Sequence, residues 1–192
     1  SNKGIEMTFV ASPISGKEFS WKKNFNISYN KNMLVSLSDE NYDHSYLMLE
    51  MPNGMAYGFG GETAYKIEEG EPLGNIHGWE FAGFSEDGKW QVWNETRTEK
   101  IHPSTATFDD KKIIGNGMPK SYIGFINNFA YRRFDLAIAL KGALGFEILN
   151  ILDLGYENLG LLPANIPLTA ITDPEISKLR DVRNYITSYH VE

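Results

Sequence analysis

Residues 128–145, NFAYRRFDLAIALKGALG, decide the fold class that this sequence predicts. Good helix formers fill the stretch, and apolar side chains recur with the spacing of one helix face, at Phe134, Ala137, Ile138 and Leu144. Asn128 can cap such a helix, because its side-chain oxygen can accept a hydrogen bond from an early backbone N–H, and Gly145 is a suitable stop. We therefore predict a helix over Phe129–Leu144.

The half of the chain before this stretch is typical of short β-strands. Apolar and β-favouring runs alternate with Asn, Ser, Gly and Lys, at Ile5–Val10, Phe25–Tyr29, Met33–Leu37, His44–Met51 and Met55–Gly60. The Asn53-Gly54 pair predicts a hairpin between the last two runs, because both residues tolerate positive φ. Asp87-Gly88 predicts a second hairpin, between His77–Phe84 and Lys89–Trp93. A long loop follows over 94–119, with one strand near Lys111–Ile114.

The C-terminal part predicts further helix. Phe146–Leu154 is an apolar run that suits either a buried helix or a strand, and Tyr156–Leu168 is predicted as a loop. Thr172-Asp173-Pro174-Glu175 fits a capping box that opens a last helix, with an apolar stripe reaching Tyr189. Strands followed by helices predict one α+β domain over residues 1–192. In it, an antiparallel sheet from the N-terminal half is packed by helices from the C-terminal half.

Composition narrows the function classes. The chain has 192 residues, of which 42% are hydrophobic, so it can bury a core. The net charge of −7 argues against nucleic acid as a partner. There is no apolar run of about 18 residues, so no transmembrane helix is expected, and the N-terminus lacks the apolar stretch of a signal peptide. The absence of cysteine excludes disulfides, and the four histidines lack metal-ligand spacing, so we expect no metal and no cofactor.

One strand carries a possible chemical site. Alternate residues of a strand share a face, which puts His44, Tyr46, Met48 and Glu50 on one side. A phenol or carboxylate beside an imidazole can orient the ring and stabilise its charged form. The competing interpretation is an ordinary histidine on the wet face of a hairpin.

The segment Asp43–Glu50, followed by a turn and Tyr57–Gly60, resembles the histidine hairpin of circularly permuted papain-fold hydrolases, which include bacterial amidases and toxin-like effectors. In that family the hairpin precedes a helix whose N-terminal cysteine is the nucleophile. The chain order here is similar, with Asn127-Asn128-Phe129-Ala130 opening the predicted helix. The resemblance implies that His44 is the general base, that Tyr46 or Glu50 orients it, and that Ala130, or its rival Phe129, occupies the nucleophile position.

Because the chain has no cysteine, the resemblance implies an inert form, substituted or degenerate, of a papain-like amidase or acyl hydrolase. Cysteine-type hydrolysis would then require a restored nucleophile. A peptide, peptidoglycan or lipid-like substrate, or a protein partner, and a secreted location as in bacterial effectors are the corresponding expectations. The alternative is a non-enzymatic β-rich module that binds a small ligand, a glycan or a protein partner. An aromatic face would serve it, made of Trp79, Phe81, Trp90 and Trp93.

Overall fold

The computed structural model describes residues 1–38, 43–50, 63–150, 168 and 172. In the first three of these ranges every regular element is a strand, apart from one 3-10 turn. The elements are β1 (Asn2–Ser15), β2 (Phe19–Asn32), β3 (Tyr46–Glu50), β4 (Thr63–Glu68), β5 (Asn75–Trp79), β6 (Phe81–Phe84), β7 (Trp90–Trp93), β8 (Lys100–Ile101), η1 (Phe108–Asp110), β9 (Lys111–Asn116), β10 (Ser121–Tyr131) and β11 (Phe134–Leu144).

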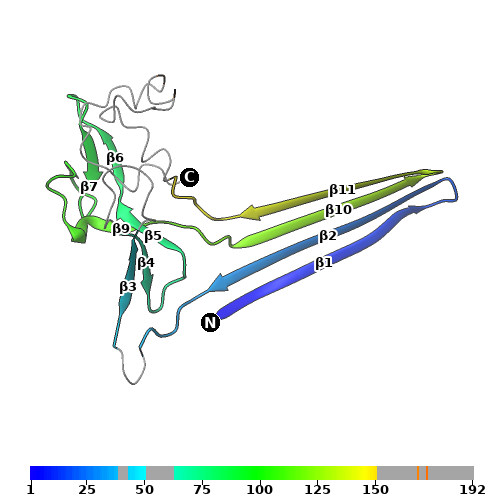
Figure 1. The fold of residues 1–192 in the computed structure, drawn as a ribbon, viewed down its shortest axis with the longest axis horizontal. Coiled ribbons are helices and arrows are strands. Elements are labelled where there is room, and N and C mark those ends of the chain that lie inside the picture. Colours follow the sequence, from blue (N-terminus) through cyan, green and yellow to red (C-terminus); the bar gives the residue numbers. More distant parts are fainter. Residues whose placement is uncertain (39–42, 51–62, 151–167, 169–171, 173–192) are drawn as a thin grey trace.

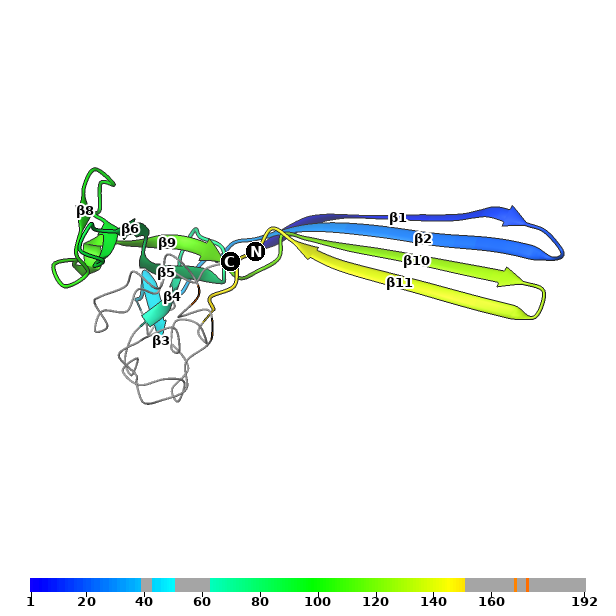
Figure 2. The ribbon, with the colours of Figure 1, turned by 90° about the horizontal axis from the view of Figure 1, so that it is seen from above.

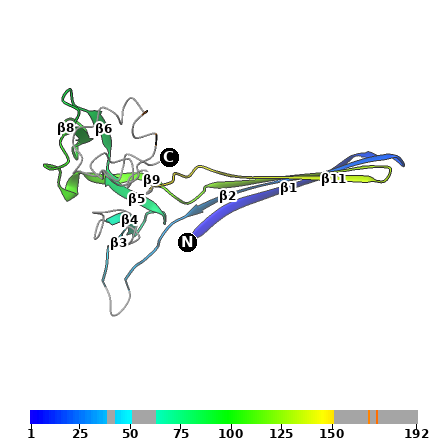
Figure 3. The same cartoon turned by 45° about the horizontal axis from the view of Figure 1, so that its top comes forward.

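The strands form a long arm and a smaller head (Figure 1). The arm is one antiparallel sheet in the order β1-β2-β10-β11, and its strands lie side by side in Figure 2. Figure 3 shows that the arm leaves the head as a single layer. The head contains the sheets β3-β4-β5-β9 and β6-β7-β8, which belong to the segment between β2 and β10. The long segment that connects β2 to β10 therefore forms these two sheets of the head.

Tight turns close the arm at its far end. Gly16 N–H donates to the carbonyl of Phe19 at 2.9 Å, which closes the β1–β2 turn. Only Arg132 and Arg133 join β10 to β11, and Arg132 has φ of 56°, as such a short turn requires. Arg132 N–H donates to the carbonyl of Glu18 at 2.8 Å, so the two turns are tied together.

The predicted α+β class is wrong, and the predicted helix over Phe129–Leu144 is the reason. Its first residues end β10, and Phe134–Leu144 is β11. The sequence of β11 also has a period of two, since Phe134, Leu136, Ile138 and Leu140 alternate with other residues. Over its whole length β11 pairs with β10, which supplies hydrogen-bond partners for the backbone groups on one side of β11, and this pairing overrides the helix propensity of its alanines and leucines.

Several predicted strands are confirmed. The runs at residues 5–10 and 25–29 lie within β1 and β2, and the strand near residue 111 is β9. The Asp87-Gly88 hairpin joins β6 to β7, although its first arm breaks at Glu80, where β5 turns away to pair with β9. No strand forms over Met33–Leu37. The predicted elements at Met55–Gly60, Tyr156–Leu168 and the last helix lie outside the described residues, apart from single positions.

The head holds the buried core of the described residues. Trp90 and Val92 are buried, and five partly buried side chains pack against them, namely Trp79, Phe81, Phe84, Ile101 and Ala106. The rings of Phe84 and Trp90 lie 4.9 Å apart, centroid to centroid. Trp79, Phe81 and Trp90, three of the four aromatic residues expected to form an open ligand face, therefore belong to the buried core.

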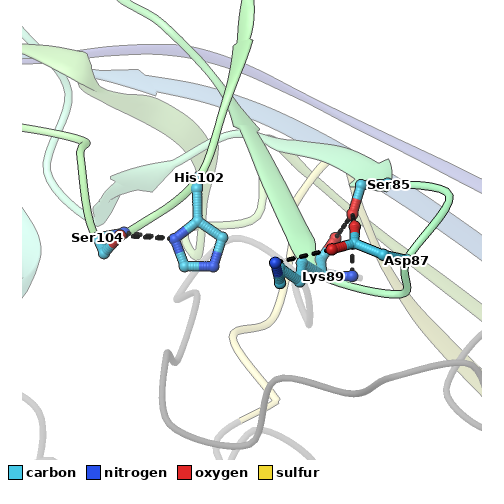
Figure 4. A network of polar contacts seen from close by, with 5 residues as sticks. All are labelled: Ser85, Asp87, Lys89, His102 and Ser104. Carbon is cyan, nitrogen blue, oxygen red and sulfur yellow. Dashed lines mark hydrogen bonds and ion pairs between the residues drawn. The ribbon is translucent and has the colours of Figure 1, made fainter.

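The hairpin turn between β6 and β7 is fixed by a local polar network (Figure 4). Ser85 Oγ donates to Asp87 Oδ1 at 2.5 Å and accepts from Lys89 N–H at 3.0 Å. Lys89 Nζ pairs with Asp87 at 2.7 Å. These hydrogen bonds from Lys89 and Ser85 lower the pKa of Asp87 to about 2. In the same view, His102 Nδ1 contacts Ser104 Oγ at 2.7 Å, a contact between near neighbours in the chain.

Candidate functional site

The arm has one apolar face and one polar face. On β11, Phe134, Leu136, Ile138, Leu140 and Leu144 share a face, and on β1 the same face carries Ile5, Met7, Phe9 and Ala11. The register aligns these side chains in rows across the sheet, such as Phe9–Phe25–Phe125–Leu140. In that row the ring centroids of neighbouring phenylalanines are 6.3 Å apart. Phe9 and Leu140 remain 59% and 58% exposed, so the apolar face is open.

The opposite face of the arm is mainly polar. It carries Glu6, Thr8, Ser20, Lys22, Asn24, Asn26, Ser28, Asn128, Asp135 and Lys141, among alanines and Gly124. Val10, Tyr122 and Ile126 are the larger, less polar side chains on this face. A Cβ on Gly124 would lie 2.5 Å from the Asn26 amide, so a larger residue at this position would displace the Asn26 side chain. The Asn26 side chain therefore lies across the neighbouring strand. Four strands thus share one division into an apolar and a polar side.

Aromatic side chains border the apolar face at both ends. Trp21, Phe129, Tyr131 and Phe134 lie near the turns, and Tyr29 lies near the head. Trp21 and Phe129 stack with ring centroids 5.8 Å apart. Between these ends the face is interrupted by two polar residues, Lys23 and Asn127, which are direct cross-strand partners. Asn127 is only 8% exposed and accepts a hydrogen bond from Trp21 Nε1 at 3.1 Å.

No helix among the described residues is long and apolar enough to cross a membrane.

A polar cavity of about 450 Å³ lies where the arm meets the head. Its lining combines amides, two lysines and one carboxylate with apolar side chains, including Asn30, Lys31, Lys120, Glu71, Asn75, Asn116, Met118 and Ile113. Asn116 organises one wall. Its Nδ2 donates to Asn75 Oδ1 at 2.7 Å and to the Leu73 carbonyl at 3.0 Å, and its Oδ1 accepts from Met118 N–H at 2.8 Å. Such a lining combines apolar surface with a few polar and charged groups that can orient a ligand.

The structure distributes the residues of the predicted catalytic site between the head and the arm. Tyr46 and Glu50 begin and end β3, and His44 lies just before it, where its backbone hydrogen-bonds with Ser38 Oγ. Lys66 Nζ lies 5.3 Å from the ring centroid of Tyr46. Ala130 lies in β10 of the arm, opposite Ser20 and Asp135. No helix begins at Ala130, so the helix N-terminus that would activate a nucleophile there is missing.

His77 is the histidine with the most distinctive surroundings among the described residues. It lies in β5, is 4% exposed, and contacts the ring of Phe108 with centroids 5.5 Å apart. Burial, with smaller contributions from Lys66 and Lys111, lowers the pKa of His77 to about 4, so the ring is neutral at pH 7. No group of three or more potential metal ligands occurs in the described part of the chain.

Sequence reasoning missed both faces of the arm. The signal for a strand was present in the sequence, because Phe134, Leu136, Ile138 and Leu140 are apolar at every second position. The prediction instead used the apolar residues that fit the helical period of 3.6. Trp21, Lys23 and Asn127 carried no recognisable motif, because their relation depends on the pairing of β2 with β10.

Comparisons with known proteins connect this chain to bacterial receptors. It is 29% identical to TonB-dependent receptor P3 of Formosa agariphila over 99% of its length, and 37% identical to TonB-dependent receptor P39 of the same bacterium over 77% of its length. The chain spans only about a fifth of these relatives, 20% and 17% of their respective lengths. No protein-family model matches it.

Solved structures show the same fold. The chain matches the RagAB peptide transporter with a TM-score of 0.70 and 18% identity, over 96% of this chain and 20% of that one. It also matches the RagAB peptide importer in its closed-closed state, with a TM-score of 0.66 and 19% identity, over 82% and 16% of the two chains.

These findings overturn the papain-like interpretation. The relatives are receptors and transporters, not amidases, acyl hydrolases or toxin-like effectors, and the fold lacks the packing helices of the hydrolase expectation. The alternative expectation, a non-enzymatic β-rich binding module, agrees better with both.

Proposed function

We propose that this chain is a section of an outer-membrane nutrient receptor of the TonB-dependent type. In it, the arm lies within the membrane and the head projects from the membrane to meet the nutrient. The observation that carries the proposal is the common division of four paired strands into an apolar and a polar face. The similarity to TonB-dependent receptors supports it.

The dimensions of the arm suit a membrane. A tilted strand needs about 9–11 residues to cross the hydrocarbon layer, and the four strands have 14, 14, 11 and 11 residues. The aromatic residues at both ends of the apolar face match the preference of Trp and Tyr for the membrane–water boundary. The open apolar side chains would be unfavourable in water, since an exposed patch larger than about 600 Å² is unusual on a soluble protein.

The orientation follows from the connections. Short turns join strands at one end of the arm, and the long segment that folds into the head joins β2 to β10 at the other. In outer-membrane proteins the short turns face the periplasm and the long connections face outwards. The head and its polar cavity are therefore assigned to the outer surface, and the polar face of the arm to the solute path.

The two edge strands of the arm are expected to pair with further strands. β1 and β11 are its outermost strands, and each presents one row of backbone groups. In hydrocarbon an unpaired backbone group costs several kcal/mol. We therefore expect further strands of the longer protein to pair with both edges.

For the ligand, we propose a peptide bound at the cavity between arm and head. The RagAB structures are of a peptide transporter. Lys31 and Lys120 can receive carboxylate groups, and Glu71 can receive an amino group, while the asparagines can match backbone amides.

The membrane placement is tested by site-directed fluorescence, and this chain contributes no cysteine that would compete for the label. Leu140→Cys and Ala139→Cys are neighbours on opposite faces of β11. Each is labelled with a small fluorophore in the full-length receptor, reconstituted in vesicles with nitroxide-labelled lipid. We expect strong quenching at residue 140 and little at residue 139. Equal quenching at both would refute the placement.

The ligand assignment is tested by calorimetric titration of the full-length receptor with a mixture of short peptides. Removing one charge of an ion pair with a bound ligand should weaken binding by about tenfold, equivalent to about 1.4 kcal/mol. We expect this effect for Lys31→Gln and Lys120→Gln, and none for Lys17→Gln in the distant β1–β2 turn. Equal affinity in all three variants would remove the cavity from the peptide site.

A further inference from the structure

The apolar face of the arm contains one polar cluster, made of Trp21, Lys23 and Asn127. Lys23 Nζ lies 5.5 Å from the centroid of the Trp21 ring, so the ammonium is drawn towards the turn end of the arm. Asn127 is buried beside it and holds the indole through Trp21 Nε1. The described residues offer Lys23 no carboxylate partner. The indole is thus fixed, and the cation beside it is left to meet an anion from outside the chain.

An apolar groove lies next to this cluster on the same face. It has a volume of about 530 Å³ and is lined by Phe25, Ile123, Phe125, Leu140 and Gly142 of this face, together with Lys141, which the register places on the polar face. Gly142 opens it, because a Cβ on that residue would meet no atom within 4 Å. A larger residue would be accommodated there without a clash, so the glycine leaves a space on the surface of the sheet.

The cluster and the groove follow one another along the strands. Phe25 and Phe125 are the next residues on this face after Lys23 and Asn127, in the direction of the head. Gly142 lies in the row after that, opposite Ile123. Two residues of strand cover about 6.7 Å, so the groove begins one row from the backbone position of Lys23, on the side away from its ammonium. A cation near the turns, with an apolar groove running from it towards the middle of the arm, matches the shape of a phospholipid.

We infer that this face binds one phospholipid from the leaflet nearest the turns, with its phosphate at Lys23 and one acyl chain in the groove at Gly142. The inference rests on the proposed placement of the arm in a membrane. A lysine inside an apolar band directs its ammonium to the nearest polar boundary, where the phosphates of that leaflet lie. The Trp21 ring limits the positions of the ammonium, so less freedom is lost when the phosphate binds.

The test uses the full-length receptor, purified in mild detergent, stripped of lipid and titrated with dioleoyl phosphatidylethanolamine under native mass spectrometry. Loss of the ion pair should weaken binding about tenfold in Lys23→Gln, equivalent to about 1.4 kcal/mol. Gly142→Val fills the groove and should weaken binding to a similar degree. Dioleoylglycerol, which has the same chains and no phosphate, should bind the unmodified receptor about as weakly as the phospholipid binds Lys23→Gln.

Two matched controls sit on the polar face. Lys22→Gln removes the same charge one residue away, and Ala143→Val creates the same branched side chain one residue away. Both should bind phospholipid as the unmodified receptor does. Equal binding by Lys23→Gln and Lys22→Gln would overturn the phosphate assignment, and so would equal affinity for dioleoylglycerol. Equal binding by Gly142→Val and Ala143→Val would overturn the acyl-chain assignment.

The membrane fraction of the same cells separates this inference from the proposed function. A receptor that is recovered with the outer membrane, but binds phospholipid no better than Lys23→Gln, refutes the lipid site alone. A receptor that stays out of the membrane refutes both.

Discussion

Replacing Leu140 by arginine would place a charge in the middle of the apolar face of the arm. Tyr29 follows Trp21 by eight residues, and Phe25, in the row of Leu140, lies midway between them. Eight residues span about 27 Å along a strand, or about 20 Å across a membrane at a tilt of about 40°. Leu140 would then be near the midplane, about 10 Å from either boundary.

Leu136 provides a matched control, since it lies on the same strand and face but in the row of Trp21, at the boundary. An arginine costs about 2–4 kcal/mol at the midplane of a membrane strand and about 0–1 kcal/mol near the boundary. The two leucines are 58% and 57% exposed, so in water both substitutions would change the free energy of unfolding by about 0.5 kcal/mol or less. The difference between the two variants in the free energy of unfolding therefore shows whether lipid or water surrounds the apolar face.

The measurement is a guanidinium titration of the full-length receptor in lipid vesicles, followed by tryptophan fluorescence. We expect Leu140→Arg to lower the free energy of unfolding by about 1–4 kcal/mol more than Leu136→Arg. Equal and small effects would mean that the apolar face meets water, or another protein, and would refute the argument from membrane depth.

Three further predictions concern the turn, the cavity wall and the head. Arg132→Val should lower the free energy of unfolding by about 1–2 kcal/mol, because Arg132 has a left-handed backbone conformation that a β-branched residue resists; Arg132→Gly should not, and the same titration measures both. Asn116→Ala should cost about 1–3 kcal/mol by leaving buried Asn75 Oδ1 without its donor, and faster hydrogen exchange in β5 and β9 would record it. The folded head binds a proton on His77 only below about pH 4, whereas the unfolded chain binds it from about 6.5; the head should therefore lose stability as pH falls from 6.5 towards 4. Thermal melting at several pH values measures this slope, which His77→Gln should reduce, and an unchanged slope would contradict a buried neutral ring.

Local sequence signals were sufficient to predict strands where a strand and its turn are adjacent in the chain. Asp87-Gly88 identified the β6–β7 hairpin, because the residues that form its turn are themselves unusual in their backbone freedom. The runs in β1 and β2 were found for a similar reason, since β-favouring side chains gather there.

The same local reasoning failed for β11. Alanine, leucine and lysine favour a helix when they are judged one residue at a time. The strand exists because β10 supplies partners for its backbone, and because alternate side chains meet different surroundings on the two faces. The catalytic interpretation failed with it, since Ala130 needed the N-terminus of a helix that does not form.

The sequence by itself determined the β-rich character of the first half, the absence of thiol chemistry and the alternation within each strand of the arm. Only the tertiary structure decided that β2 pairs with β10 across the whole head segment, which aligns the four alternations into one apolar and one polar surface. The physical reason is that alternation within a strand fixes which residues share a side. Which residues become neighbours across strands depends on register, and register is set by pairing between distant parts of the chain.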